Sequence, residues 1–335
     1  MTFPRFNIPS WVRWVFSIAV MALIFTQVDF SSFTGTVMSA NPLWLLLGLV
    51  MIFFETVAVA VAWRAMIRTK GYSPPFFTML HIMLTANFLG FVLPSSMGSD
   101  IVKVVGLSKY IGNAAEALSS LLLFRVIGYG VLFLIAFIAA TLFSGYLPDE
   151  PFVKGISIFL VIGCLVAAVG IIFMKPAFGL LKWLLLSVNL GSLFEKLKKV
   201  HDALFLYLGH PVAMAKAVAG AIFMQIDRIV YVFVIALALG IEVEPVTLCL
   251  FVPLITALTV IPISVSGIGV REGGYVFLFG YAGLSAGEAL SLSLCGFALD
   301  IVFVLLGGVI YLLFGFPENE GLQDPDKLEK LITED

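Results

Sequence analysis

The chain is organised around residues 254–272, which read LITALTVIPISVSGIGVRE. An apolar run leads to Pro262, a Gly/Ser segment follows, and the stretch ends on the charged pair Arg271 and Glu272 before another apolar run begins. Irregular backbone at membrane depth has to be shielded by protein or water, because lipid cannot satisfy its polar groups. The pattern therefore predicts a re-entrant, broken helix that lines a site.

A second stretch repeats this pattern. Residues 79–103 read MLHIMLTANFLGFVLPSSMGSDIVK, and Lys103 stands at the same offset from Pro94 as Arg271 does from Pro262. Both stretches continue into long apolar segments with similar openings, NAAEALS at 113–119 and SAGEALS at 285–291. Two such units predict an internal repeat, a common plan among secondary transporters.

The composition is that of an integral membrane protein. Of the 335 residues, 61% are hydrophobic and 12% are charged, against roughly 45–50% and about 25% in ordinary soluble domains. A net charge of −2 and the lack of a basic cluster interleaved with aromatic residues give no sign of a nucleic-acid partner. Cys164, Cys249 and Cys295 lie in apolar segments, so we expect them to be packing residues.

Six apolar segments are long enough to cross a bilayer, given that a spanning helix needs about 20 apolar residues. The predicted spans are 12–28, 43–63, 114–142, 153–174, 212–240 and 288–314, and the predicted broken pairs are 77–112 and 246–283. The fold class is therefore an all-α polytopic membrane protein with about six full spans and two re-entrant helix pairs.

The distribution of Lys and Arg in short loops predicts the orientation. Loops 29–42, 143–152 and 241–245 contain neither residue, whereas segment 175–211 contains five lysines. We therefore expect a protein of the cytoplasmic membrane with both termini in the cytoplasm. The first broken pair then enters from the cytoplasm and the second from outside, which makes the repeat inverted.

The domain organisation is predicted to be simple. A single transmembrane domain covers 1–316, with repeat cores at about 77–142 and 246–314, and an acidic cytoplasmic tail covers 317–335. Segment 192–208 has the pattern of an amphipathic helix whose lysines would meet anionic headgroups on the inner membrane surface. A plain connector is equally compatible with that segment.

Five ionisable side chains fall near the middle of predicted spans: Glu55, Arg125, Asp227, Arg228 and Asp300. An ionisable group at bilayer depth costs several kcal/mol unless it is paired or hydrated, so each is a candidate functional residue. Arg125 and Asp300 differ in depth by about one helical turn when the two helix openings are aligned. We expect them to form an ion pair between the repeats that gates the site; a purely structural pair is the alternative.

Two acidic residues fit a structural role. Asn113 with Glu116, and Ser285 with Glu288, both match the capping box, in which the acid satisfies a backbone donor at a helix start. We expect these four residues to be helix caps.

The Gly/Ser turns of the broken helices predict an anion site. A turn that opens a half-helix presents free N–H groups and a positive dipole end, and a neighbouring base adds a full charge. The candidate headgroup-binding residues are Gly98, Asp100, Lys103, Ser266, Gly267, Gly269, Arg271 and Glu272. The alternative is that Lys103 and Arg271 only extend to the membrane interface.

Motifs of soluble enzymes are missing from the sequence. It contains no Walker A, HExxH or GxSxG motif, and the segment Gly267–Gly273 departs from the dinucleotide fingerprint. His81, His201 and His210 are too scattered to predict a metal site. We expect no cofactor, no metal and no enzymatic activity.

The broken helices resemble the flippase-like membrane domain family, which includes the transmembrane region of lysylphosphatidylglycerol synthases. The family signature Pro-Gly-Gly-x-Gly-Gly-Asp-x-x-Arg stands here as Pro94-Ser-Ser-Met-Gly98-Ser-Asp100-Ile-Val-Lys103, with three glycines replaced by serine and Arg by Lys. The second signature is closer, as Ser266-Gly-Ile-Gly-Val-Arg271-Glu272-Gly273, and Arg125 also matches.

The resemblance implies movement of an anionic amphiphile across the bilayer, either a phospholipid such as phosphatidylglycerol or a polyprenyl-phosphate carrier. Arg271 and Lys103 would hold the phosphate, and Arg125 and Asp300 would gate it. Two other functions stay open: a non-transporting partner of a lipid or glycan synthase, and a headgroup transferase with Asp100, Glu272 or Asp300 as general base.

Overall fold

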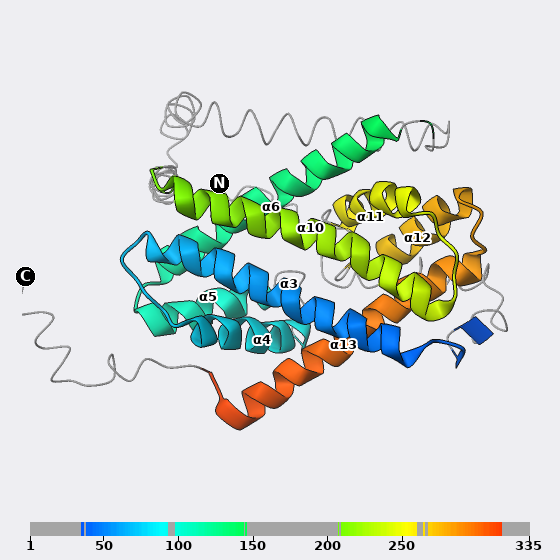
Figure 1. The fold of residues 1–335 in the computed structure, drawn as a ribbon. Helices are drawn as coiled ribbons and strands as arrows, with labels where there is room; N and C mark the ends of the chain where they lie inside the picture. The colour runs from blue at the N-terminus through cyan, green and yellow to red at the C-terminus, as the bar shows by residue number, and fades with distance from the viewer. Residues whose placement is uncertain are drawn as a thin grey trace, which may run out of the picture.

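The computed structural model describes residues 35–36, 38–92, 98–143, 145, 207, 209–259, 264 and 267–316. All regular secondary structure in these residues is helical, which confirms the all-α class (Figure 1). The predicted spans 12–28 and 153–174 and the tail 317–335 lie outside the described residues, as does the amphipathic segment 192–208 except for Tyr207.

Four helices are long and apolar enough to cross a membrane, and they correspond to four of the predicted spans. They are α3 (Pro42–Arg68), α6 (Ala114–Leu142), α10 (Pro211–Leu239) and α13 (Ala286–Phe314). Four shorter helices occupy the two predicted broken pairs. They are α4 (Phe76–Val92), α5 (Gly98–Ile111), α11 (Pro245–Thr259) and α12 (Val270–Tyr281).

Local sequence sets the ends of the long helices. The Asn41 side chain accepts a hydrogen bond from the Leu43 N–H at 3.0 Å, and Pro42 at the first helical position lacks an N–H that needs a partner. At the other end of α10, Gly240 adopts the left-handed conformation (φ 67°) that closes many helices. The start of α3 lies beside the end of α10, because the Asn41 N–H donates a hydrogen bond to the Ala238 carbonyl.

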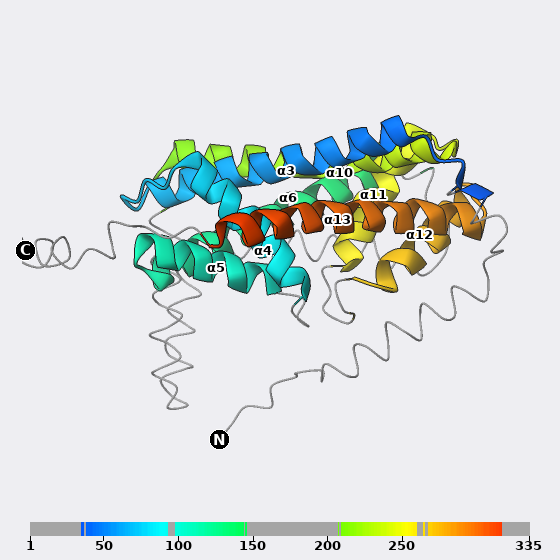
Figure 2. The ribbon, with the colours of Figure 1, turned by 90° about the horizontal axis from the view of Figure 1, so that it is seen from below.

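The short helices form two hairpins, and each helix is shorter than a typical membrane span. Helices α4, α5, α11 and α12 have 17, 14, 15 and 12 residues, whereas a span needs about 20. The pair α4/α5 lies at one end of the long helices and the pair α11/α12 at the other, as both views show (Figures 1 and 2).

The helices pack in a pattern that treats the two halves of the chain alike. Helices α3 and α10 form the most extensive pair, running in opposite directions (Figure 1). The first short helix of each half packs on a long helix of the other half: α4 packs on α13, and α11 packs on α6. The second short helix stays with its own half, since α5 packs on α6 and α12 on α13.

Close helix contacts depend on glycine at a few positions. A Cβ on Gly220 of α10 would lie 2.7 Å from the Cβ of Ala62 on α3, and one on Gly307 of α13 would lie 2.4 Å from the Leu84 carbonyl oxygen on α4. Small residues at such crossings are typical of membrane helix packing, where close backbone approach replaces the hydrophobic driving force.

Much apolar surface faces outward. In the most apolar part of α3 and of α13, only 22% of the residues are buried. A soluble protein of this size rarely exposes a continuous apolar surface so large, so these faces are suited to lipid.

Candidate functional site

The first hairpin directs its acidic residue toward the following long helix. Asp100 lies in the first turn of α5, and its Oδ2 is 2.5 Å from Nη2 of Arg125 on α6. Arg125 also donates from Nη1 to the Tyr129 hydroxyl at 2.5 Å, one turn further along α6. Lys103 lies at the edge of this group, with its Nζ 4.0 Å from Oδ1 of Asp100. Two cations of the first half therefore share one carboxylate.

The expected pair between Arg125 and Asp300 is wrong, because Arg125 pairs with Asp100. Helix α6 packs against α5, its neighbour in the same half, and this packing places Asp100 within reach of the guanidinium. The charges acting on Asp300 are instead those of Arg228, Arg271 and Glu55. The sequence argument compared only positions along the helices, whereas rotation about the helix axes also selects the partner.

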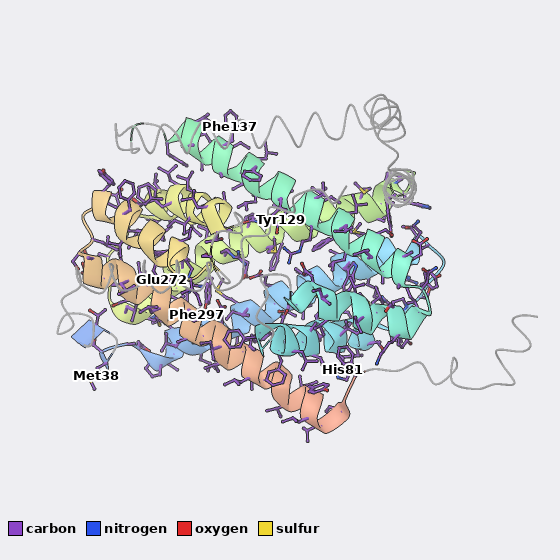
Figure 3. The ribbon with its side chains drawn as sticks, turned by 180° about the vertical axis from the view of Figure 1, so that it is seen from behind. Met38, His81, Tyr129, Phe137, Glu272 and Phe297 are labelled. Atoms are coloured by element: carbon purple, nitrogen blue, oxygen red, sulfur yellow. The ribbon has the colours of Figure 1, made fainter. Side chains whose placement is uncertain are left out.

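The second hairpin holds a tighter cluster. Glu272 is 1% exposed, and its Oε1 accepts hydrogen bonds from Arg271 Nη2 at 2.6 Å and Arg271 Nε at 3.0 Å. Ser293 on α13 donates to the same oxygen at 3.3 Å and accepts from Arg271 Nε at 3.2 Å. The guanidinium of Arg271 also lies 4.6 Å from the ring centre of Phe297. Figure 3 marks Glu272 and Phe297 on the neighbouring helices α12 and α13.

Two backbone donors at the start of α12 already have partners within the hairpin. The Gly269 N–H donates to Oε2 of Glu272 at 2.6 Å, and the Arg271 N–H donates to the Gly267 carbonyl at 2.9 Å. Gly267 and Gly269 have φ angles of 78° and 88°, a conformation that favours glycine. The sequence predicted free N–H groups here, but the Gly269 N–H already donates its hydrogen bond to the carboxylate of Glu272. Ser266 lies outside the described residues.

A third group of charges joins α3, α10 and α13. Nη2 of Arg228 lies 3.4 Å from Oε1 of Glu55. The charge of Glu55 also acts on Lys103 of the first hairpin and on Asp300 of α13. Asp227, beside Arg228, is buried, and its Oδ2 has no hydrogen-bond partner in the described part of the chain. The contact between Glu55 and Arg228 joins a charge of the first half to one of the second half.

Exposure separates the four cations into two classes. The side chains of Arg228 and Arg125 are 40% and 38% exposed, whereas those of Arg271 and Lys103 are 21% and 15% exposed. Arg271 also has three partners of its own. Arg228 and Arg125 are therefore better placed to meet a ligand than the two bases that the signatures single out.

The predicted caps are present with one difference. Ser285 and Glu288 form a complete capping box, with the Ser285 N–H donating to Glu288 at 2.8 Å and the Glu288 N–H donating to the Ser285 hydroxyl at 3.2 Å. Asn113 caps α6, but the carboxylate of Glu116 lies 3.1 Å from Nζ of Lys70 and does not close the box. The side chain of Lys70 is only 7% exposed. Its buried charge therefore needs a counter-charge more than the start of α6 needs a second cap.

Several residues of the site carry no motif of their own. Tyr129, Ser293 and Phe297 were not expected from the sequence. The available signals are positional, since Tyr129 follows Arg125 by four residues and faces the same side of its helix. Among the described residues, no group of three or more His, Cys, Asp or Glu side chains is arranged to hold a metal ion.

Comparison with protein families shows the family to which the chain belongs. A family model described as the lysylphosphatidylglycerol synthase TM region matches residues 10–308. The matched residues include both hairpins and all of the charged side chains described above. The search of curated proteins found no match.

Proposed function

Because the chain belongs to the lysylphosphatidylglycerol synthase transmembrane-region family, we propose that it is a flippase-like protein that moves an anionic lipid across the cytoplasmic membrane. The candidate substrates are a phospholipid such as phosphatidylglycerol and a polyprenyl-phosphate carrier. Both have a phosphate headgroup that needs cations inside the membrane and chains that stay in lipid.

One observation carries the proposal: four cations from four helices lie between two hairpins that sit at opposite ends of the long helices, two of them well inside the long helices α6 and α10. Lys103 and Arg271 come from the hairpins, and Arg125 and Arg228 come from the long helices α6 and α10. Charges at this depth cost several kcal/mol, and a structural pair would need only one acid and one base. A set shared between the halves supports a path for a charged substrate.

The substrate phosphate competes with carboxylates in this mechanism. Every cation of the set has a nearby acid, so a phosphate binds by replacing a carboxylate on a guanidinium, whose planar fork suits either group. Arg228 is the first contact, because its distance to Glu55 is 3.4 Å and its side chain is the most exposed of the four. Arg125 is the second, with Asp100 as the group that is displaced.

Release of a carboxylate then couples the two halves. When the phosphate binds Arg228, the side chain of Glu55 is released. Glu55 then turns toward Lys103, which already lies within the influence of the Glu55 charge. When the phosphate moves to Arg125, Asp100 keeps Lys103 and Glu55 returns to Arg228. With the hairpins treated as inverted repeats, these two arrangements correspond to access from opposite sides of the membrane.

The test is a reconstitution in liposomes that contain phosphatidylglycerol with a labelled headgroup. The readout is the fraction of label that a membrane-impermeant quencher reaches, which starts near one half when only the outer leaflet is accessible. We expect the intact chain to raise this fraction well above one half. Arg228→Gln should abolish the rise, and Arg228→Lys should restore part of it, because it keeps charge but loses the fork.

Lys109→Gln is the matched control, since Lys109 is an exposed base at the end of α5 outside the charged set. Equal activity of Arg228→Gln and the intact chain would remove Arg228 from the path. Failure of the intact chain with both labelled phosphatidylglycerol and a labelled polyprenyl phosphate would refute lipid movement.

A further inference from the structure

A second basic site lies at the end of the long helices, away from the central charges. A pocket of about 500 Å³ opens between the last turns of α3 and the first turns of α10. Among the described residues, its lining includes Arg64, Arg68, Lys216 and His210 and no acidic side chain. Arg68 is 13 residues from Glu55 along α3, which places it about 20 Å from the central site at 1.5 Å per residue.

The cations of this pocket have no counter-charge in the described part of the chain. Arg68 and Lys216 are exposed, and neither forms an ion pair there. Arg64 donates from Nε to the Pro74 carbonyl at 2.6 Å, which fixes the side chain and leaves its terminal nitrogens available. Lys70, two residues beyond Arg68, is by contrast paired with Glu116.

The start of α10 adds to the positive potential. The N-cap residue His210 makes no side-chain hydrogen bond to the helix, and Pro211 follows at the first helical position. The positive dipole end of a 29-residue helix favours an anion, and here it lies in the lining of the same pocket as the three bases.

Apolar side chains continue from the pocket along both helices. Val61 on α3 and Val212 on α10 line the pocket and are exposed. The exposed Phe54, seven residues before Val61, and Phe223, eleven residues after Val212, lie on the same helix faces. A soluble anion would bind through the bases alone and would make no contact with the apolar surface. A molecule with a charged head and apolar chains fits both the pocket and this surface.

We propose that the pocket binds the phosphate headgroup of an anionic lipid in the leaflet next to this end of α3 and α10. The lipid's phosphate contacts Arg64, Arg68 and Lys216, and its chains lie along Val61 and Val212. This site does not rest on the proposed function, since a lipid bound here stabilises the α3–α10 pair whether or not another lipid is transported.

The experiment is native mass spectrometry of the full chain released from nanodiscs of phosphatidylcholine with increasing phosphatidylglycerol. The readout is the number of phosphatidylglycerol molecules retained per chain. We expect the double variant Arg68→Gln, Lys216→Gln to bind one fewer lipid, with about twenty-five-fold weaker affinity at that site, since each base near anionic headgroups contributes a factor of about five. The charge-keeping variant Arg68→Lys, Lys216→Arg should retain it.

Lys109→Gln serves again as control, because Lys109 is an exposed base outside the pocket. Equal lipid retention by the double variant and the intact chain would overturn the site, as would equal losses in Lys216→Gln and Lys109→Gln. A second arm adds inorganic phosphate to the chain in pure phosphatidylcholine nanodiscs. Stoichiometric binding of phosphate alone, lost in the double variant, would assign the pocket to a soluble phosphate. That result would overturn the proposal that the pocket binds a lipid.

Discussion

The guanidinium of Arg271 lies 4.6 Å from the ring centre of Phe297, and Phe297 occupies in α13 the place that Arg125 occupies in α6. Each of the two residues is twelve positions past the N-cap of its helix, Ser285 or Asn113. Both halves therefore hold a guanidinium between the second hairpin helix and the following long helix. In the first half the arginine comes from the long helix, and in the second half it comes from the hairpin.

Phe297 is expected to stabilise this contact and to connect the hairpins. Its ring faces Arg271 on α12 and lies 6.4 Å from the ring of Phe91 on α4. Replacing Phe297 by Leu keeps an apolar side chain but removes both ring contacts, so we expect a loss of about 1 kcal/mol in the free energy of unfolding. Denaturant unfolding in detergent micelles measures this loss, with the lipid-facing Phe54→Leu as control.

The pair of Asp100 and Arg125 should show energetic coupling. Arg125 is 38% exposed, so we discount the pair for solvent and expect a coupling of about 1 kcal/mol in a double-mutant cycle. The cycle uses Asp100→Asn, Arg125→Gln and both together, with unfolding followed by circular dichroism. Asp300→Asn combined with Arg125→Gln should give additive losses. Coupling of Arg125 to Asp300 and not to Asp100 would contradict the structure.

Glu272 should be the most sensitive acidic residue of the site. Its buried carboxylate accepts bonds from Arg271, Ser293 and the Gly269 N–H, so Glu272→Gln leaves a paired cation without its counter-charge. We expect a loss of about 3 kcal/mol in the free energy of unfolding. Adding Arg271→Met removes the unpaired charge and should recover part of the loss. A double variant that is less stable than Glu272→Gln would show that the ion pair is not the source of the effect.

The sequence predicted well the helices that the structure describes, because their signals are local. The span 114–142 and the helix α6 have the same bounds, and the Ser285 capping box is formed as its spacing indicates. The partners of charged residues were harder to predict, since they depend on how the helices rotate against one another. Asp100 pairs with Arg125 because α5 packs on α6. The spacing of residues within either helix gives no information on that packing.

The pair of Arg271 and Glu272 escaped prediction for a different reason. Neighbouring residues in a helix point in different directions, so adjacent opposite charges rarely meet. Here Glu272 turns back to the Gly269 N–H in the first turn of α12, and this places its other oxygen beside the guanidinium. A glycine with positive φ makes that turn possible, which the Gly/Ser pattern indicated without giving the partner.

Gly307 should be essential for the contact between the two halves. A Cβ at this position would lie 2.4 Å from the Leu84 carbonyl oxygen on α4, a backbone atom that cannot move without shifting the helix. We expect Gly307→Ala to cost about 2 kcal/mol in the free energy of unfolding, the range seen when a packed interface is overfilled. Gly130→Ala on α6 is the control, because nothing lies within 4 Å of its added Cβ and alanine favours a helix by up to about 1 kcal/mol. Thermal unfolding of both variants in the same detergent distinguishes the cases: if Gly307→Ala is as stable as Gly130→Ala, α4 does not pack on α13 as closely as described, and the exchange of short helices between the halves is wrong.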